Sequence, residues 1–352
     1  MNNGWTYCDR ISKTSAGQTV LAYYSDRYRH SSKAEWQTRI ADGQILLNGQ
    51  PTDGQTILRS GHRLSYRRSP WQESDVPLGF DVLYEDEHLW VIAKPSGLPV
   101  LPGGGFLEHT LLHQLRSRYP NQAPIPVHRL GRGTSGAMLI AKSHSSRDAL
   151  ARQFRTRTAT QNAVAKDSAV QDSAVVTPDN AQTLTKIYRA LIGPAMVDEP
   201  GDSATKTLPE RFICRYPIGK LPHQQLGYIY GHSANGLPAR SDCTVMQRTE
   251  AATLVDVSIS TGRLHQIRIH LAAAGFPLIG DPLYPVGGVP APNCTARPGD
   301  VGYCLHAHQL RFVHPHSGKP VSITAPLPSV LQTDLEMASV QTNHKRSSVP
   351  QK

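Results

Sequence analysis

Apolar residues recur at helical spacing within the first fifty positions of the chain. Leu21, Tyr24 and Tyr28 stand three or four residues apart, as do Trp36 and Ile40. This spacing places the apolar side chains on one face of a helix, so it predicts two short helices in this segment.

Period-two patterns follow these helices. Residues 45–50 are typical of a strand that ends in an Asn-Gly hairpin turn, and residues 61–68 of a closing strand. The first residues are polar, and we expect a flexible N-terminus at 1–16. A small domain at 17–69 and a proline-containing linker at 70–79 should come next.

Beyond residue 79, short apolar runs alternate with turns that contain Gly or Pro, which indicates one larger domain at 80–335. Two polar stretches interrupt this pattern: a low-complexity insertion at 158–183 and a tail at 336–352, which we expect to be disordered. The pattern predicts strands at 45–50, 61–68, 89–93, 137–141, 186–193, 239–247, 252–258, 306–313 and 320–325, and helices at 109–118, 147–157 and 263–274.

The composition favours a polyanionic partner. Lys and Arg exceed Asp and Glu by ten, which suits RNA or DNA, although a basic surface without a specific partner has the same composition. The five cysteines form no CxxC pair, which favours reduced thiols in the cytoplasm. The sequence shows no secretory signal and no apolar run of about 20 residues, the length a membrane helix needs.

Residues 127–142 form the most informative stretch. A polar turn with three glycines, His-Arg-Leu-Gly-Arg-Gly-Thr-Ser-Gly at 128–136, precedes the apolar run at 137–141. A basic loop fixed on a buried strand is a rigid way to present side chains to a ligand. We therefore expect the functional site here.

This stretch resembles the signature of the RluA-type RNA pseudouridine synthases, which reads His-Arg-Leu-Asp, two residues, then Thr-Ser-Gly. Gly131 stands at the position of the catalytic aspartate, and Gly133 where an acidic residue is often found. Residues 17–69 also resemble the small RNA-binding domain of the ribosomal protein S-four type. Further segments match the RluA-type family in order at Lys186–Ala190, Thr261–His270, Gly280–Tyr284 and Leu305–Ala307.

The resemblance implies an α+β fold, with a mixed, mainly antiparallel sheet flanked by helices and preceded by the small RNA-binding domain. It implies isomerisation of uridine to pseudouridine without cofactor or metal. Tyr188 would stack on the flipped base, Arg268 would orient the carboxylate, and Arg129 would hold the RNA open. The candidate site residues are Gly131, Tyr188 and Arg268 for catalysis, and Arg129, Arg132, Arg263, His265, Arg63, Arg67 and Arg68 for RNA binding.

The helix expected at 263–274 also has a physical interpretation. At 100° per residue, Leu264, Ile267 and Leu271 share one face and should pack on the sheet. Arg268 lies at a border of that face, from which it could reach a cleft. The resemblance implies that the histidines of this segment are hydrogen-bonding scaffold rather than bases.

The glycine at position 131 leaves three explanations open. Another carboxylate could replace the aspartate, from Asp148, Asp281 or the insertion, with Asp281 the weakest candidate. The chain could instead bind RNA without modifying it, or use chemistry that tolerates the loss. Without a facing carboxylate Arg268 would carry an uncompensated charge, so we expect either a substitute anion or a wetter cleft.

The leading hypothesis is therefore a monomeric, cytoplasmic pseudouridine synthase that acts on ribosomal or transfer RNA. The rival hypothesis is a catalytically inactive relative that binds RNA. A metal-dependent regulator is a weaker third hypothesis, because soft ligands lie close together in the sequence. These ligands are Cys294, Cys304, His306 and His308, whose spacing is unusual for zinc.

Overall fold

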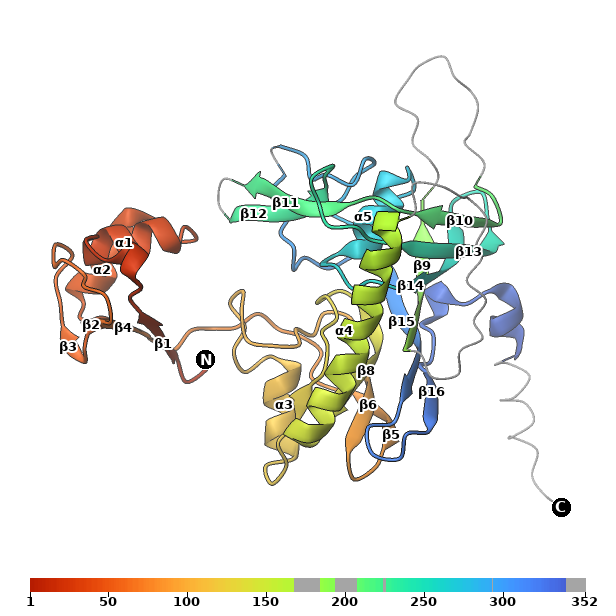
Figure 1. Cartoon of the computed structure of the whole chain (residues 1–352), viewed down its shortest axis with the longest axis horizontal. Helices are drawn as coiled ribbons and strands as arrows, with labels where there is room; N and C mark the ends of the chain where they lie inside the picture. The colour runs from red at the N-terminus through yellow and green to blue at the C-terminus, as the bar shows by residue number, and fades with distance from the viewer. Residues whose placement is uncertain (168–183, 194–207, 224–225, 293, 340–352) are drawn as a thin grey trace, which may run out of the picture. The chain divides into compact units, whose positions relative to one another are not determined.

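The computed structural model describes residues 1–167, 184–193, 208–223, 226–292 and 294–339 (Figure 1). The chain divides into two compact units, Met1–Ser74 with Leu221–Ile229, and Asp75–Lys220 with Tyr230–Lys352. The division after Ser74 falls inside the segment expected to be a linker, where residues 69–80 contain no helix or strand.

The first unit packs two helices on a small sheet with strand order β1-β4-β2-β3. Thr19 and Ser32 cap the two helices with their side-chain oxygens, and Asn48 and Gly49 adopt the positive φ values of 51° and 87° that a tight hairpin turn requires. The elements are β1 (Trp5–Arg10), η1 (Lys13–Ser15), α1 (Val20–Arg27), α2 (Lys33–Ala41), β2 (Ile45–Leu47), β3 (Gln50–Pro51) and β4 (Arg63–Arg68).

The expectation of a flexible N-terminus at 1–16 was wrong. Strand β1 pairs antiparallel with β4 along its whole length, from Trp5 opposite Arg68 to Arg10 opposite Arg63. The buried side chain of Asn2 also donates to Glu73 at 2.7 Å. Most side chains of β1 are exposed, so backbone pairing holds this strand and no hydrophobic pattern marks it in the sequence.

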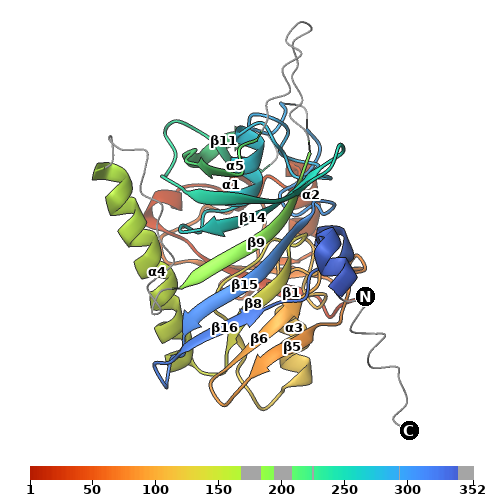
Figure 2. The same ribbon diagram turned by 90° about the vertical axis from the view of Figure 1, so that its right-hand side faces the viewer.

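The second unit is built around one ten-stranded sheet (Figure 2). Its strand order is β10-β13-β14-β9-β15-β8-β6-β5, with β16 beside β15 and β7 beside β8. The strands are β5 (Asp81–Glu85), β6 (Leu89–Lys94), β7 (Ile125–Pro126), β8 (Ser135–Ala141), β9 (Thr185–Ile192), β10 (Arg211–Cys214), β13 (Ser241–Arg248), β14 (Thr253–Ile259), β15 (Leu305–Val313) and β16 (Pro320–Thr324).

The sheet is mixed and mainly antiparallel, as expected. Strands β8 and β15 pair in parallel, with Gly136 opposite Ala307, whereas the other described pairings of the sheet are antiparallel. Gly136 is required there, because a Cβ atom would lie 2.3 Å from the carbonyl oxygen of Ala307. The starts of β8 and β15 therefore lie side by side.

Helices complete this unit, whereas residues 221–229 of a further hairpin are grouped with the first unit. Helix α4 packs against β7, β8 and β15, and α5 against β13. The hairpin β11-β12 was not expected from the sequence. The remaining elements are α3 (Leu111–Arg118), α4 (His144–Asp167), β11 (Ile218–His223), β12 (Gly227–His232), α5 (Gln266–Ala273) and η2 (Ser329–Leu331). In the part of the chain that the structure describes, no helix is long and apolar enough to cross a bilayer.

Two expected boundaries were wrong. Helix α4 continues to Asp167, so the first ten residues of the expected insertion are helical, and residues 168–183 lie outside the described residues. The tail expected to be disordered from residue 336 begins inside a helical segment, which the described residues show at 334–339. Polar sequences hide both features, because apolar periodicity was the signal used to find helices.

Candidate active site

The segment Gly131–Thr134, here called the 131–134 loop, lies within the signature stretch and leads directly into β8. Lys94, at the end of β6, is 1% exposed. Its Nζ donates to the carbonyl oxygens of Pro95 at 2.8 Å, Leu98 at 2.8 Å and Arg132 at 3.1 Å. Burial and the nearby Arg132 charge lower the pKa of Lys94 to about 7, yet three acceptors match the three N–H donors of an ammonium group.

The turn after Lys94 binds the same loop twice more. The hydroxyl of Ser96 donates to the carbonyl of Gly133 at 2.7 Å. Gly97 and Arg132 exchange hydrogen bonds, from the Gly97 amide at 2.8 Å and from the Arg132 Nε at 3.0 Å. The Arg132 guanidinium also lies 4.7 Å from the Phe106 ring centre. These contacts fix the backbone of the loop before any ligand binds.

His128 supports the loop from its N-terminal side. Its Nε2 accepts from the Leu139 amide of β8 at 3.2 Å, and its ring stacks on Phe154 of α4 at 4.9 Å. Burial lowers the pKa of His128 to about 3, so the ring is neutral. It is suited to anchoring the loop rather than to binding phosphate.

Helix α5 begins at Gln266, three residues later than expected, because a side chain organises the preceding turn. The Gln266 Oε1 accepts from the Thr261 hydroxyl at 2.7 Å and from the Arg263 amide at 3.1 Å. His265 adopts a left-handed conformation with φ 55°. Leu264 precedes the helix and is 37% exposed, so the expectation that it packs on the sheet was wrong.

The two histidines of this segment are tied into the structure. His265 Nδ1 shares a hydrogen bond with the Tyr284 hydroxyl at 2.7 Å. His270 contacts the Ser241 hydroxyl and the Tyr216 carbonyl, each at 2.9 Å. Burial lowers the pKa of His265 to about 3 and that of His270 to about 4. A neutral, engaged His265 offers no cation to RNA phosphates.

Arg268 faces a carboxylate, although position 131 has none. Its Nε and Nη2 each bind Asp281 at 2.7 Å, and the side chains of both residues are almost fully buried. Burial alone would lower the pKa of Arg268, but the bonds to Asp281 raise it. Of the two expected outcomes, an anion or a wetter cleft, Arg268 has the anion; it is the carboxylate that the sequence made the weakest candidate to replace the aspartate.

Asp281 is fully engaged by these contacts. One of its oxygens also accepts from the amides of Leu283 at 2.9 Å and Tyr284 at 3.2 Å. Asp148, the other named candidate, pairs with Arg147 on the exposed side of α4. Asp148 follows the C-terminal end of β8, whereas the 131–134 loop precedes its start. A strand of seven residues spans about 20 Å, which separates the two. Neither carboxylate is available to a ligand beside Gly131.

Tyr303 bridges the 131–134 loop and Arg268. Its ring centre lies 4.1 Å from the guanidinium carbon of Arg268. Its hydroxyl lies 3.3 Å from the Thr134 Oγ1. Sequence reasoning missed Tyr303, because it precedes β15 in a loop and no recognised motif contains it. The signal would have been a hydroxyl-bearing residue two positions before the Leu-His-Ala strand.

Tyr188 lies in the same hydrophobic cluster as Leu130 and Tyr303. It stands opposite Ala307 on the neighbouring strand β15, which in turn faces Gly136 of β8. The side chain is 9% exposed, and burial raises the pKa of Tyr188 to about 12. The strand order therefore brings Tyr188 to the end of the sheet where the 131–134 loop begins.

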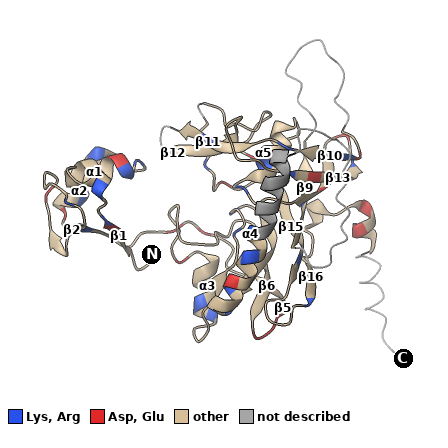
Figure 3. Cartoon of the chain, viewed as in Figure 1, with Lys and Arg blue, Asp and Glu red and all other residues tan. Residues whose placement is uncertain are grey.

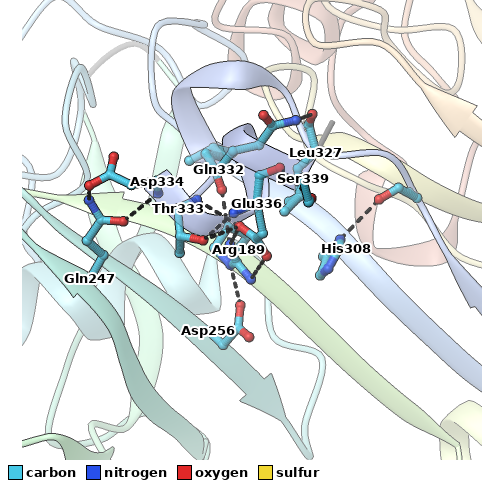
Figure 4. Close-up of polar contacts among 12 residues, drawn as sticks. Arg189, Gln247, Asp256, His308, Leu327, Gln332, Thr333, Asp334, Glu336 and Ser339 are labelled. Atoms are coloured by element: carbon cyan, nitrogen blue, oxygen red, sulfur yellow. Dashed lines mark hydrogen bonds and ion pairs between the residues drawn. The ribbon is translucent and has the colours of Figure 1, made fainter. Parts of the chain in front are cut away.

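Arg189, which follows Tyr188 on β9, anchors the C-terminal segment (Figure 4). Arg189 is 2% exposed. Its guanidinium binds Asp256 of β14 at 2.6 Å, Glu336 at 3.0 and 3.3 Å, and the Leu331 carbonyl at 3.1 Å. Adjacent strand residues point to opposite faces, so this cluster supports β9 from the face opposite Tyr188.

The remaining predicted residues are more dispersed. Arg129 is exposed, whereas Arg263 is half-buried and its Nε donates to the Pro238 carbonyl at 3.2 Å. Arg63, Arg67 and the partly buried Arg68 lie on β4 of the first unit, and Arg68 stacks on Trp71 at 3.6 Å. Figure 3 shows Lys and Arg on α1, α3 and α4 as well.

The two histidines considered for zinc have other partners. His306 binds the Ser135 hydroxyl at 2.8 Å, and His308 binds the Ala325 carbonyl at 3.0 Å. Within the described ranges, no group of three or more His, Cys, Asp and Glu side chains is arranged to hold a metal ion. The structure gives the metal-dependent hypothesis no support.

Comparison with known proteins shows similarity to RNA pseudouridine synthases. The family model described as RNA pseudouridylate synthase matches residues 88–273. An uncharacterised RNA pseudouridine synthase of Synechocystis is 47% identical, covering 89% of this chain and 96% of that protein. RNA pseudouridine synthase 5 of Arabidopsis thaliana is 38% identical over 96% of both chains. Ribosomal large subunit pseudouridine synthase D of Xanthomonas campestris is 31% identical, and the match covers 92% of this chain and 89% of that protein.

Proposed function

Because this chain belongs to the RNA pseudouridylate synthase family, we propose that it isomerises uridine to pseudouridine in RNA. The observation that carries the proposal is the arrangement around Tyr303. Its ring joins the 131–134 loop to Arg268, so the two most specific signature segments meet at one place. An engaged arginine and a fixed loop at the start of β8 are suited to holding a flipped nucleotide.

The substrate we propose is ribosomal or transfer RNA. The relative in Xanthomonas campestris is named a ribosomal large subunit pseudouridine synthase, and the excess of ten basic residues suits a polyanionic substrate. In the first unit, Arg63 and Arg67 extend from the solvent face of β4, where they could contact phosphates. The free cysteines found in the described residues support a cytoplasmic location, and we propose a monomer.

We assign roles to residues by their position in the family signature. Tyr188 would stack on the uracil, Arg129 would contact the RNA beside the flipped nucleotide, and Arg268 would fix the geometry of the site through Tyr303 and Asp281. The exposure of Gly131 and Arg129 leaves this face of the loop open to RNA. His265 is neutral, so its role would be to position Tyr284 and not to bind phosphate.

The test is a pseudouridine map of total RNA from wild-type cells and from cells lacking the gene. Complementation with wild-type protein and with Tyr188→Phe protein would accompany it. A uridine that loses modification in the deletion strain and regains it only with wild-type protein would establish the activity. An unchanged map, combined with salt-dependent binding of structured RNA, would instead favour the inactive RNA-binding alternative. That alternative follows from the glycine at position 131, which has no side chain to replace the aspartate.

A further inference from the structure

The side chain of Tyr303 occupies the space that a residue at position 131 would fill. A Cβ atom built on Gly131 would lie 2.8 Å from the Tyr303 hydroxyl oxygen and 3.3 Å from the Thr134 Oγ1. A Cβ atom on Gly133 would lie 2.8 and 2.9 Å from ring carbons Cε1 and Cζ of Tyr303. Neither glycine has a positive φ, so close packing against this ring, not backbone conformation, explains both of them.

Tyr303 is held in one orientation by its surroundings. The residue is 5% exposed, and the Arg268 guanidinium covers its ring at 4.1 Å. Asp281 in turn fixes Arg268 with two hydrogen bonds of 2.7 Å. The hydroxyl group is therefore directed at Gly131, whose own surface is exposed. A polar group is thus presented at the position where the family signature places an aspartate.

We propose that the Tyr303 hydroxyl is the proton-transferring catalytic group of this site, in place of a carboxylate at position 131. The inference rests on the proposed function. The two carboxylates named as replacements do not compete for this role, because Asp281 is bound to Arg268 and two amides, and Asp148 lies beyond the far end of β8; the insertion, also weighed as a source, lies mostly outside the described residues. Thr134 accepts or donates one hydrogen bond to the same hydroxyl, which helps to orient it.

The chemistry balances with a phenol alone. The bond between C1′ and N1 of the uridine breaks, and the electron pair leaves with the uracil. The Tyr303 hydroxyl gives its proton to N1, which leaves a phenolate. After the uracil turns, C5 forms the new bond to C1′, and the phenolate takes the proton that C5 releases. The product is pseudouridine and the hydroxyl is regenerated, so no oxidant, reductant or co-reactant is needed.

The decisive variant is Tyr303→Phe, which keeps the ring on Arg268 and removes only the hydroxyl oxygen. The assay is tritium release to water from transcripts that carry [5-³H]uridine and cover the site found by the pseudouridine map. General acid–base groups contribute roughly 10²- to 10⁴-fold to rate, so we expect release to fall at least about 100-fold. RNA affinity and the thermal unfolding midpoint should stay at wild-type values.

Tyr84→Phe is the matched control. Its hydroxyl also donates to a neighbouring side chain, that of Asp86 at 2.7 Å, but it lies on β5 at the edge of the sheet. We expect full activity from this variant. Tyr303→Phe protein that retains at least half of the wild-type rate would overturn the proposal. Absence of release from wild-type protein would overturn the proposed function itself, so the two failures are distinguishable.

A double variant tests whether the hydroxyl and a carboxylate share one place. Gly131→Asp alone would force its Cβ against the Tyr303 hydroxyl at 2.8 Å. In Gly131→Asp/Tyr303→Phe that oxygen is gone and the carboxylate has room. We expect tritium release at least about 10-fold above that of Tyr303→Phe, as proton transfer returns. If the double variant folds and binds RNA but shows no more tritium release than Tyr303→Phe, the idea that a carboxylate and the hydroxyl can replace each other would be overturned.

Discussion

The pair formed by Arg268 and Asp281 should be the most sensitive polar contact of the second unit. The two side chains are 2% and 1% exposed, and breaking a buried ion pair by removing one charge costs about 3–5 kcal/mol. The substitution Asp281→Asn removes the charge and keeps the shape, so it isolates this electrostatic contribution to the free energy of unfolding.

The hydrogen bonds of Asp281 refine this magnitude. One carboxylate oxygen accepts from Arg268 Nη2, from the Leu283 amide and from the Tyr284 amide. An asparagine oxygen at the same place could keep all three bonds. The other oxygen accepts from Arg268 Nε at 2.7 Å. An asparagine amide at that place would bring its own N–H group against the N–H group of Arg268 Nε, and this hydrogen bond would be lost. We expect a loss of about 3 kcal/mol, the lower end of the range, because most acceptors remain.

Thiol labelling in increasing urea would measure this loss within the second unit. Cys214 and Cys243 belong to this unit and are 1% and 2% exposed, so their modification reports its opening, whereas the exposed Cys8 lies in the first unit. Glu210→Gln is the control, because its partner Arg248 is on the surface and such pairs contribute about 1 kcal/mol or less. An Asp281→Asn protein that opens within 0.5 kcal/mol of this control would refute the reasoning.

Three further predictions concern the supports of the site and the first unit. Lys94→Met leaves three carbonyl oxygens without their donor, and should cost about 2 kcal/mol in urea unfolding and lower the rate of tritium release. Burial opposes ionisation of Glu336, but the hydrogen bonds from Arg189 lower its pKa to about 2. The unfolded value is about 4.3, so this stabilisation is present above that pH and is lost as pH falls towards 2. Unfolding midpoints of Glu336→Gln should therefore vary less with pH in that window than those of wild type, and equal slopes would contradict the linkage. Replacing Arg63 and Arg67 with Gln should reduce the slope of log affinity for RNA against log salt by up to about 2, and an unchanged slope would exclude them from the interface.

The sequence was sufficient to predict helices, strands and turns wherever a pattern of side chains determines the local structure. The apolar run of β8, the spacing of Trp36 and Ile40 in α2, and the Asn-Gly turn each predicted an element that the structure contains. It was insufficient for β1, which depends on pairing with a distant strand. The ion pair between Arg268 and Asp281 was also not predicted, because two side chains 13 residues apart meet only through the path of the loop that follows α5.

The burial of Asp281 also limits what a restored aspartate at position 131 can do. Arg268 and Asp281 already balance each other's charge, so a second carboxylate at position 131 would add an uncompensated negative charge. A like charge nearby raises a carboxyl pKa. In Gly131→Asp/Tyr303→Phe, the carboxyl group must be protonated to give its proton to N1, so the rate of tritium release should fall as pH rises through a value above the ordinary 3.9 for aspartate. A rate that already falls steeply at pH 5 would show that Asp281 does not influence this position, whereas a plateau that extends above pH 5 would report the raised pKa.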